Sequence, residues 1–486
     1  MRSYPQTHLI SSFEILHISL TTVSMSAQPD MISNLPDELL VQIVSCLPFK
    51  ECVRTSVLSK RWRYQYRETT NLGFKESDFV SPSLQDPDRI DARQRFVDFV
   101  FQWVGRVQNR VVESFELCLS SPRAYLAQVE ALIAFAVRKQ VKKLVLDFSS
   151  PTWRISPSVP DHEVFVVVPE SVYNLTSLES LTVSGCRGFD TKRFADPGIF
   201  KSLSFGWMRL LDVEYLLSKA YRLVSLNINN CWELDIVGME GNLREVSIQN
   251  CKFPDVSLSF DLPRVDIFKY SGDIIYLRFN RMNTIIKEVH LDFQMLIKEY
   301  EDPNDPNTLC DHLYGLRSAM TLTVCPYLLR VIQQPIYQMH LLQPLTTQHL
   351  VLKTRLHPKE FNGIMILLSN CPDLETLTLD MLPPTSFSTD PTYPGIDHKT
   401  YWMQNMTCIC LMKTLKVVVV RNFVRGRNDL NVLKYLIRYG TVLERVELYL
   451  PYGVDEDKKK FANEGAEMLQ RSSKHVHVPC AQFLKR

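Results

Sequence analysis

Twelve cysteines and eleven histidines are the residues in this chain of 486 that could bind a metal ion or act as nucleophile and base. A zinc site needs Cys or His ligands at short, paired spacings. The cysteines run from Cys46 to Cys480 without a CxxC pair and without histidines at ligand spacing, and Cys408 with Cys410 forms one isolated pair. We therefore predict no metal site, and we expect reduced, mostly buried thiols.

Catalytic motifs are missing from the sequence as well. It contains no GxSxG, GxxxxGKS/T, GxGxxG or HExxH, the patterns that form nucleophile elbows, phosphate loops, dinucleotide sites and zinc protease sites. His290, His340 and His357 lie on or beside expected strands without an evident Asp or Cys partner. We predict a chain that carries out no catalytic step and holds no cofactor.

Three of the cysteines close a repeated pattern instead. Leu-x-x-Leu-x-Val-x-x-Cys, or a close variant of it, occurs at 178–186, 223–231 and 243–251. This is the strand-and-turn unit of a leucine-rich repeat, in which alternate apolar residues of a short parallel strand point inward and the cysteine satisfies backbone groups of the turn. Neighbouring strands lie about 4.8 Å apart, which strains a compact tetrahedral metal site. We therefore predict a structural role for these cysteines.

Weaker copies of the strand pattern continue to the C-terminal part of the chain. They lie at 141–146, 286–291, 350–352, 374–379, 415–420 and 443–448. Irregular intervals and polar inserts such as 301–308 and 383–394 indicate a degenerate solenoid of roughly ten strands with loops between its turns. Residues 430–448 also repeat the pattern of 361–379, and each copy reads as an amphipathic helix, a break and an alternating strand. The predicted fold class is an α/β or α+β solenoid with parallel strands and outer helices.

The stretch 32–74 reads differently, as three short helices. Apolar residues recur in it at helical spacing: Leu39, Leu40, Ile43, Val44 and Leu47. Pro36 suits the first helical position, and Asp37 and Glu38 suit the positive end of the helix dipole. Pro48 is expected to end this first helix.

A second helix is expected at 49–55, and a third helix, capped by Ser56 or Ser59, is expected to carry Trp62. Three helices of this length expose more apolar surface than they cover for themselves. A partner, or the rest of the chain, must therefore cover it.

Two motifs in this stretch carry a resemblance to a known family. Leu35-Pro36-Asp37-Glu38 and then VRTSVLSKRWR at 53–63 together resemble an F-box of the plant type. The resemblance implies docking on a small Skp-type adapter, which links the chain to a cullin-RING ubiquitin ligase. Positions that resemble the family's adapter-contacting or core positions are Leu35, Pro36, Leu39, Ile43, Leu47, Val57, Leu58 and Trp62. Where the family usually has Tyr-Leu-Trp, this chain has Tyr64-Gln65-Tyr66, and Tyr66 can fill much of the place of the Trp.

The stretch from 349 to 451 resembles the FBD region at the end of plant F-box and leucine-rich-repeat proteins. A helix with an apolar stripe is expected from Asp91 to about Val107, where it would pack the small module onto the next domain. The predicted domains are an N-terminal extension expected to be disordered (1–30), the F-box (31–77), a linker and packing helix (78–110), leucine-rich repeats in an irregular horseshoe (111–345), the FBD region continuing the solenoid (346–452) and a C-terminal tail (453–486).

Composition argues against several classes of partner. The net charge is +2, with 55 Lys and Arg against 53 Asp and Glu, so neither nucleic acid nor an anionic membrane is expected as a partner. The basic runs at 421–427 and 458–460 are expected to be solvated loops. The apolar stretch 9–23 contains Glu14 and His17 and is too short to span a bilayer, so a signal peptide is not expected.

The resemblance implies a non-catalytic, substrate-recognition subunit of an SCF-type ubiquitin ligase. Such a subunit would bind the adapter through the F-box and a target protein through the repeat and FBD surface, in the cytoplasm, the nucleus or both. Two other functions remain open, a small-molecule, hormone-like co-receptor and an adapter-bound scaffold that delivers nothing for degradation. Roughly ten strands predict an open arc without an enclosed pocket, which favours a protein target over a small molecule.

Overall fold

The computed structural model divides the chain into two compact units, Met1–Thr69 and Thr70–Arg486. It describes residues 32–483 except 33–34, 82, 86, 108–109, 155–165, 235, 254–256, 283–284, 294–305, 333–343, 384–399, 403–407 and 473–474. The predicted N-terminal extension 1–30 lies outside the described residues, as does most of the predicted loop at 383–394. We call the described part of the first unit the helical unit and that of the second the sheet unit.

The helical unit consists of α1 (Asp37–Cys46), α2 (Phe49–Arg54) and the 3-10 helices η1 (Thr55–Val57) and η2 (Trp62–Glu68). Its core is formed by buried residues from α1, α2 and η2, with three half-buried neighbours packed against it: Leu40, Val44, Cys52 and Trp62, then Leu35, Leu47 and Tyr66. Tyr66 therefore packs against the core, as its expected replacement of a Trp requires. Pro36 occupies the N-cap position, one residue before the position predicted for it.

The predicted third helix is present only in part, as the 3-10 helix η2 that carries Trp62, and it is not continuous with Val57 and Leu58. The chain after α2 forms two separate 3-10 turns, and neither Ser56 nor Ser59 caps a helix. The reason is that both flanks of the intervening residues are fixed to earlier parts of the unit. The Thr55 hydroxyl donates to the carbonyl of Cys52 at 2.7 Å, and the Arg61 guanidinium donates to the carboxylate of Asp37 at 2.7 and 3.2 Å.

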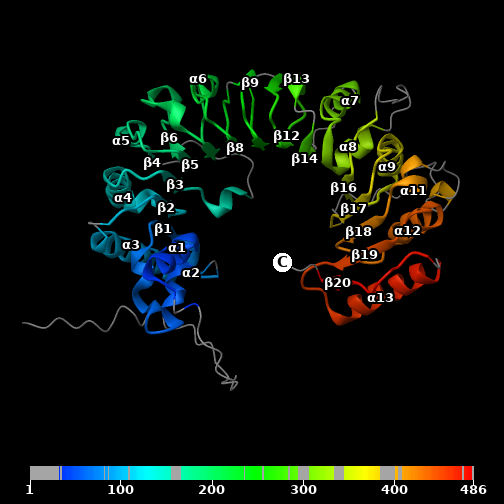
Figure 1. Cartoon of the computed structure of the whole chain (residues 1–486), viewed down its shortest axis with the longest axis horizontal. Coiled ribbons are helices and arrows are strands. Elements are labelled where there is room, and N and C mark those ends of the chain that lie inside the picture. Colours follow the sequence, from blue (N-terminus) through cyan, green and yellow to red (C-terminus); the bar gives the residue numbers. More distant parts are fainter. Residues whose placement is uncertain are drawn as a thin grey trace, which may run out of the picture. The chain divides into compact units, whose positions relative to one another are not determined.

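The sheet unit is built on one parallel sheet that contains fifteen strands within the described residues (Figure 1). In spatial order they are β1 (Asn71–Lys75), β2 (Ser114–Cys118), β3 (Lys143–Asp147), β5 (Ser180–Ser184), β7 (Ser202–Gly206), β8 (Ser225–Asn229), β10 (Glu245–Gln249), β12 (Ile267–Gly272), β14 (Ile286–Phe293), β15 (Ala319–Val324), β16 (His349–Thr354), β17 (Thr376–Met381), β18 (Val417–Arg421), β19 (Arg445–Leu450) and β20 (Gln482–Phe483). This is a solenoid-like α/β arrangement.

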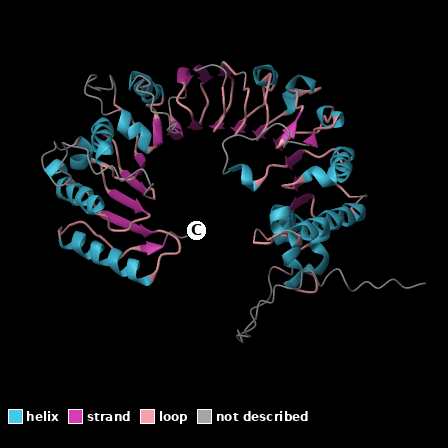
Figure 2. Ribbon diagram, turned by 180° about the vertical axis from the view of Figure 1, so that it is seen from behind, coloured by secondary structure: helices cyan, strands magenta, loops and turns pink. Residues whose placement is uncertain are grey.

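Helices line the outer side of this sheet (Figure 2). They are α3 (Asp88–Arg106), α4 (Leu126–Arg138), α5 (Glu170–Tyr173), α6 (Val213–Lys219), α7 (Pro306–Gly315), α8 (Pro326–Val331), α9 (Pro358–Asn370), α11 (Ile409–Lys413), α12 (Arg427–Tyr439) and α13 (Glu456–Arg471). The connections also contain the 3-10 turns η3 (Glu76–Asp78), η4 (Pro122–Tyr125), η5 (Pro151–Arg154), η7 (Thr191–Arg193) and η8 (Pro197–Ile199), of which η5 lies on the inner side of the sheet (Figure 1). Short outer strands complete the unit: β9 (Gly238–Glu240), β11 (Ser257–Leu262) and β13 (Tyr276–Met282) in one sheet, and β4 (Val166–Val167) with β6 (Cys186–Arg187) in another.

Two rows of apolar side chains run across the large sheet from β1 to β19 in unbroken register. The first row is Leu72, Phe115, Leu144, Leu181, Leu203, Leu226, Val246, Phe268, Val289, Leu322, Leu350, Leu377, Val418 and Val446. The second row lies two residues further along each strand, from Phe74 to Leu448. No member of the first row is more than 2 % exposed, and we call the two rows the core ladder.

The strands predicted from the repeated pattern and its weaker copies are confirmed. Each predicted segment contributes one strand to the large sheet, including β5, β8 and β10 from the three clearest copies. The strands β1, β2, β7, β12 and β15 were not predicted, because aromatic residues or Ala stand there at positions that hold Leu, Ile or Val in the predicted copies. In β7, for example, the pattern reads Phe200-x-x-Leu203-x-Phe205, and all three side chains are buried.

The cysteines that end the three clearest copies have the predicted structural role. Each thiol donates to the carbonyl of the residue two positions earlier: Cys186 to Ser184 at 3.8 Å, Cys231 to Asn229 at 3.5 Å and Cys251 to Gln249 at 3.4 Å. Burial raises the pKa of the Cys186 and Cys231 thiols far above the ordinary value, so these groups stay protonated.

One predicted domain limit needs correction, and three predicted segments differ in detail from the structure. The stretch 71–75, assigned to the F-box, is the first strand of the large sheet, because it pairs in register with Ser114–Cys118. The predicted helix begins at Asp88 and packs within the sheet unit, where Phe99 and Phe74 lie 6.5 Å apart. The predicted tail folds into α13 and β20, and residues 306–308 of the predicted loop begin α7.

The C-terminal duplication is confirmed as two helix-then-strand units, α9 with β17 and α12 with β19. Helix α9 is held by a fully buried carboxylate, Glu360, whose one oxygen accepts from the Arg330 guanidinium at 3.0 Å and whose other oxygen accepts from the Thr354 hydroxyl at 2.6 Å. Both oxygens of this buried charge are therefore paired. Helix α9 also lies directly against α8, since a Cβ on Gly363 would stand 2.0 Å from the carbonyl oxygen of Leu329.

We predict that Gly363→Ala lowers the free energy of unfolding by about 2 kcal/mol or more, because the added methyl forces two packed helices apart. Gly105 of α3 is the matched control, since a Cβ there meets nothing within 4 Å. Gly105→Ala should raise the free energy of unfolding by about 0.5 kcal/mol, because Ala favours the helix over Gly. Urea denaturation followed by circular dichroism measures both, and equal stability of the two variants would contradict the close packing.

Candidate functional site

Helix α1 divides its apolar residues between two faces. Leu40 and Val44 are fully buried in the core of the helical unit, whereas Leu39 is 41 % exposed and Ile43 36 % exposed on an adjoining face. The spacing of four residues within each pair places its two members on one helix face. One helix thus contributes both to the core and to an apolar surface.

Apolar side chains at the turn η1 are exposed as well. Val57 is 84 % exposed and Leu58 65 % exposed, which is unusual for adjacent large aliphatic side chains. Pro36 is exposed as well. We call Pro36, Leu39, Ile43, Val57 and Leu58 the exposed apolar set.

The other predicted adapter positions have a different environment. Leu35 and Leu47 are half-buried and pack against the core of the helical unit. Trp62 is 2 % exposed and belongs to that core. The sequence pattern predicted one set of adapter positions, and the structure separates it into exposed residues and residues that lie in or against the core of the helical unit.

The thiol next to Trp62 has no reactive character. Burial raises the pKa of Cys52 to about 12, although a hydrogen bond with Thr69 acts in the opposite direction. Its Sγ lies 3.8 Å from the carbonyl oxygen of Tyr66. A protonated, buried thiol is a packing group and not a nucleophile.

His290 has partners that were not evident from the sequence. Its Nε2 lies 3.0 Å from Lys353 Nζ and 3.7 Å from the carboxylate of Asp292, and Lys353 pairs with Asp292 at 2.6 Å. Burial alone would raise the pKa of Asp292, but hydrogen bonds from His290 and Lys353 hold this pKa below its ordinary value. The three groups come from β14 and β16, which are separated by β15, so only the fold brings them together.

Two further histidines have structural roles within the described residues. His357 stands at the N-cap of α9, where its Nδ1 accepts the Lys359 N–H at 3.2 Å. His340 lies outside the described residues. His312, not singled out from the sequence, is fully buried in α7, and its Nε2 accepts the Leu277 N–H at 2.9 Å. Burial lowers the pKa of His312 to about 4.

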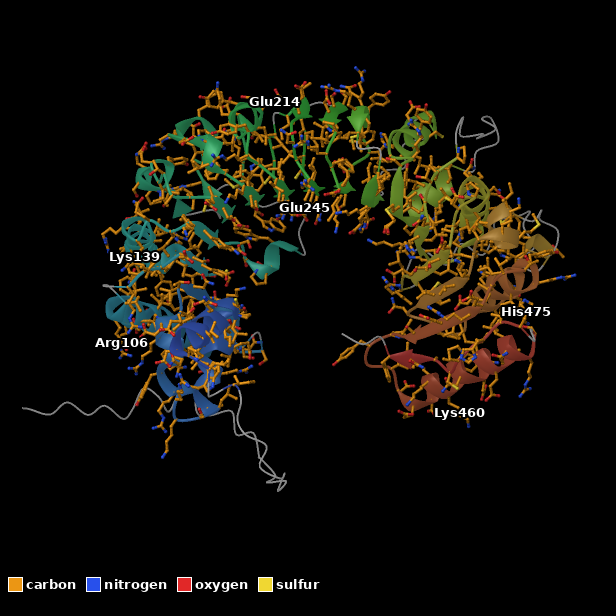
Figure 3. The ribbon with its side chains drawn as sticks, in the orientation of Figure 1. Arg106, Lys139, Glu214, Glu245, Lys460 and His475 are labelled. Atoms are coloured by element: carbon orange, nitrogen blue, oxygen red, sulfur yellow. The ribbon has the colours of Figure 1, made fainter. Side chains whose placement is uncertain are left out.

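The first basic run lies mostly in a loop, as predicted, because residues 422–426 connect β18 to α12, whereas the second run lies on a helix. Arg425 lies 4.0 Å from the ring centroid of Phe461 and pairs with Glu464 at 2.7 Å, so its charge is used within the fold. Lys458–Lys460 belong to the first turns of α13, and Figure 3 shows Lys460 on that helix.

Among the described residues there is no group of three His, Cys, Asp or Glu side chains that could hold a metal ion. Within the same residues, no helix is both long enough and apolar enough to cross a membrane.

Comparison with known proteins agrees with the two resemblances. The family model described as F-box domain matches residues 32–65, and the model described as FBD matches residues 407–448. An Arabidopsis thaliana protein named as an F-box/LRR-repeat protein is 49 % identical over 95 % of this chain and all of its own length. A second Arabidopsis protein of that name is 47 % identical over 94 % of this chain and 98 % of its own. An Arabidopsis F-box/FBD/LRR-repeat protein is 23 % identical over 90 % of this chain and 94 % of its own.

We predict that Trp62→Ala destabilises the helical unit by about 3 kcal/mol or more, because it empties the largest site in a small core. Tyr64→Ala is the matched control, since Tyr64 is 56 % exposed in the same turn. Amide hydrogen exchange at Val44 and Leu47 measures the effect in the full chain. Unchanged protection of these amides in Trp62→Ala would contradict the assignment of Trp62 to the core.

We predict that the sheet unit loses stability on acidification because of His312. Its pKa is about 4 in the fold, against 6.5 for an ordinary histidine. The fold therefore favours neutral imidazole, so its full stability is present above pH 6.5 and is lost as the pH falls towards 4, by up to about 1.4 kcal/mol per pH unit. His312→Gln keeps an acceptor for the Leu277 N–H and should flatten this slope in urea titrations. An identical slope in the variant would refute the assignment.

Proposed function

This chain belongs to the F-box/LRR-repeat family of plant proteins, and on that premise we propose that it is the substrate-recognition subunit of an SCF-type cullin-RING ubiquitin ligase. The general role of an adaptor-type subunit follows from the F-box domain match and the names of the relatives. The proposal adds a specific adapter surface and a specific target-binding domain. It assigns no chemical step to this chain, because the ubiquitin-transferring residues of such ligases belong to other subunits.

The observation that supports adapter binding most directly is the exposed apolar set. Five apolar side chains of one small unit face solvent, and two of them, Val57 and Leu58, are adjacent in sequence. Covering apolar surface with a partner yields about 25 cal/mol for each Å² removed from water. In the proposal, the Skp-type adapter contacts the exposed apolar set, while Leu35, Leu47 and Trp62 hold that surface in shape from below.

Target binding is assigned to the sheet unit. Its helices cover one side of the large sheet (Figure 1). The opposite side of the strands carries mostly polar residues, some buried, such as Ser184 and Ser247, and others half-buried or exposed. We propose that this unit is an irregular leucine-rich-repeat horseshoe in which the FBD region forms the last turns. A long row of parallel strands offers a broad surface for a protein, and concave surfaces of this kind serve that purpose in repeat proteins.

A small-molecule co-receptor is the less favoured function. A cavity lined by Phe96, Val100, Leu117 and Tyr125 lies between α3, α4 and β2, and its volume is about 10 Å³. This volume holds about one water molecule. The smallest usual ligand pockets measure about 300 Å³. A non-degradative scaffold would use the same two surfaces, and the fate of the bound target distinguishes it.

A reducing compartment suits this proposal. The twelve cysteines are all free thiols, and most of them are buried. Disulfides are rare in proteins of the cytosol and the nucleus, where thiols are kept reduced. We propose the cytoplasm, the nucleus or both as the place of action, and neither nucleic acid nor a membrane as a partner, because the net charge is only +2.

We predict that Val57→Asp abolishes co-purification with a plant Skp-type adapter, because a carboxylate replaces an apolar side chain at the centre of the proposed interface. The fold should be unaffected, since Val57 is 84 % exposed. Val111→Asp is the matched control, because Val111 is 72 % exposed in the sheet unit and outside the proposed interface. Undiminished adapter binding by Val57→Asp, with α1 still protected in hydrogen exchange, would overturn the proposed adapter surface.

A further inference from the structure

The core ladder leaves a second pair of rows on the opposite, open face of the large sheet. Alternate residues of a strand point to opposite faces, so the residue between the two ladder positions and the residue after the second one both face away from the helices. Figure 3 shows the two sides: Glu245 at the start of β10 lies on the inner side, and Glu214 of α6 lies on the outer side. We consider these two open rows from β1 to β19.

Four neighbouring strands carry no charge in the two open rows. On β5, β7, β8 and β10 the rows hold Thr182, Ser184, Ser204, Gly206, Asn227, Asn229, Ser247 and Gln249. We call these eight residues the neutral strip. It consists of hydroxyls, amides and one glycine, and these side chains can both donate and accept hydrogen bonds.

The same rows are charged on both sides of the neutral strip. Glu116 on β2 pairs with Lys75 at 3.1 Å, and Asp147 follows on β3. Beyond the strip, Asp292 pairs with Lys353 at 2.6 Å, and further charged residues stand on β17 to β19. The strip is therefore a local property of four strands and not of the whole open face.

Gly206 is buried in the middle of the neutral strip. A Cβ at this position would stand 2.7 Å from Asn229 Oδ1 and 2.9 Å from Ser184 Oγ. The polar groups of the two neighbouring strands thus lean towards each other over the glycine. Elsewhere in the strip the amides bridge to hydroxyls, Asn227 Nδ2 to Ser204 Oγ at 3.3 Å and Gln249 Nε2 to Ser247 Oγ at 3.0 Å.

Three tryptophans border the strip where the strands end. Trp207 directly follows Gly206, and its ring centroid lies 5.9 Å from that of Trp153 in η5. Trp232 packs against this pair and is half-buried. Trp153 and Trp207 are 8 % and 9 % exposed, so neither offers an open ring face on which a sugar could stack. The border is an apolar wall and not a carbohydrate platform.

We propose that the neutral strip binds an extended, uncharged segment of the target protein. Four strands at about 4.8 Å spacing span about 15 Å, which matches four or five residues of extended chain at about 3.3 Å per residue. The amides and hydroxyls bond the main-chain groups of the segment, and an apolar side chain of the segment rests against Trp232. The identity of the partner as a ligase target depends on the proposed function, whereas the binding of a neutral peptide does not.

Charge explains why the segment is neutral. Covering an ion pair with a bound chain removes its solvation, and this cost is repaid only with close geometric matching. Uncharged hydroxyls and amides lose less on burial when each finds a main-chain partner. A charged side chain placed over the strip would find no counterion among its eight residues, so the strip selects against charged segments.

The test is selection of a display library of random linear peptides on the full-length chain in complex with its adapter. The enriched peptides should share a run of uncharged residues. Asn229→Asp should weaken their binding at least tenfold, a loss of about 1.4 kcal/mol, because it puts a charge into the strip without changing its shape. The matched control is Asn280→Asp on β13, where the exposed amide donates to Ser259 Oγ at 3.0 Å outside the strip.

A second variant, Gly206→Ala, displaces the polar ends of Asn229 and Ser184 without adding charge. It should also weaken the selected peptides, and the displaced atoms are ends of side chains, so the fold should persist. Equal affinity of the parent chain, Asn229→Asp and Gly206→Ala would overturn the proposal. Three other results would also overturn it. The library could yield charged peptides whose binding depends on Lys353, or it could yield no enriched peptide. On a glycan array, the chain could bind glycans in a way that Asn229→Asp abolishes.

Adapter binding by the same variants separates this inference from the proposed function. Asn229→Asp should co-purify with the adapter as the parent chain does, because it changes only the sheet unit. If Val57→Asp also kept the adapter, the proposed function would fail while the peptide measurements still tested the strip. If the strip variants bound the selected peptides as the parent chain does, while Val57→Asp lost the adapter, the proposed peptide site would be refuted and the proposed adapter surface would be supported.

Discussion

The core ladder is the constraint on which the rest of the sheet unit depends. Each strand places two side chains in register with those of its neighbours, and the side chains of the first row are at most 2 % exposed from one end to the other. A shift of one residue in any strand would turn its apolar pair to the open face and its polar residues into the core. Register is therefore fixed strand by strand, whatever the length of the connection between two strands.

This constraint leaves the open face free to vary. The ladder positions accept only apolar residues, whereas the open rows hold ion pairs on β2, β14 and β16 and uncharged side chains from β5 to β10. The neutral strip can thus change in chemistry without a cost to the core. The outer side shows similar tolerance, since the short sheet of β9, β11 and β13 stands where other turns have helices, and Phe260 of β11 packs on Phe268 of the ladder at 5.0 Å.

The sequence predicted those strands in which aliphatic residues occupy the ladder. The sequence pattern did not predict β7 and β12, because aromatic side chains occupy their buried positions in place of Leu, Ile or Val. These residues are Phe200, Phe205, Phe268 and Tyr270. The pattern also missed the folding of the chain beyond 452, since the short strand β20 is formed only by pairing with β19. The group of His290, Asp292 and Lys353 could not be found, because its members meet across an intervening strand and no sequence spacing encodes that contact.

The helical unit shows a different limit of sequence reasoning. Helical spacing identifies an apolar face, but in α1 both faces carry apolar residues, and spacing does not say which of them is the core. Leu40 and Val44 turn inward because Trp62 returns from η2 to cover them, and Arg61, held by Asp37, fixes that return. Once Trp62 fills the interior, Leu39 and Val57 have no place in it. The core of this unit therefore determines which apolar residues are left for a partner.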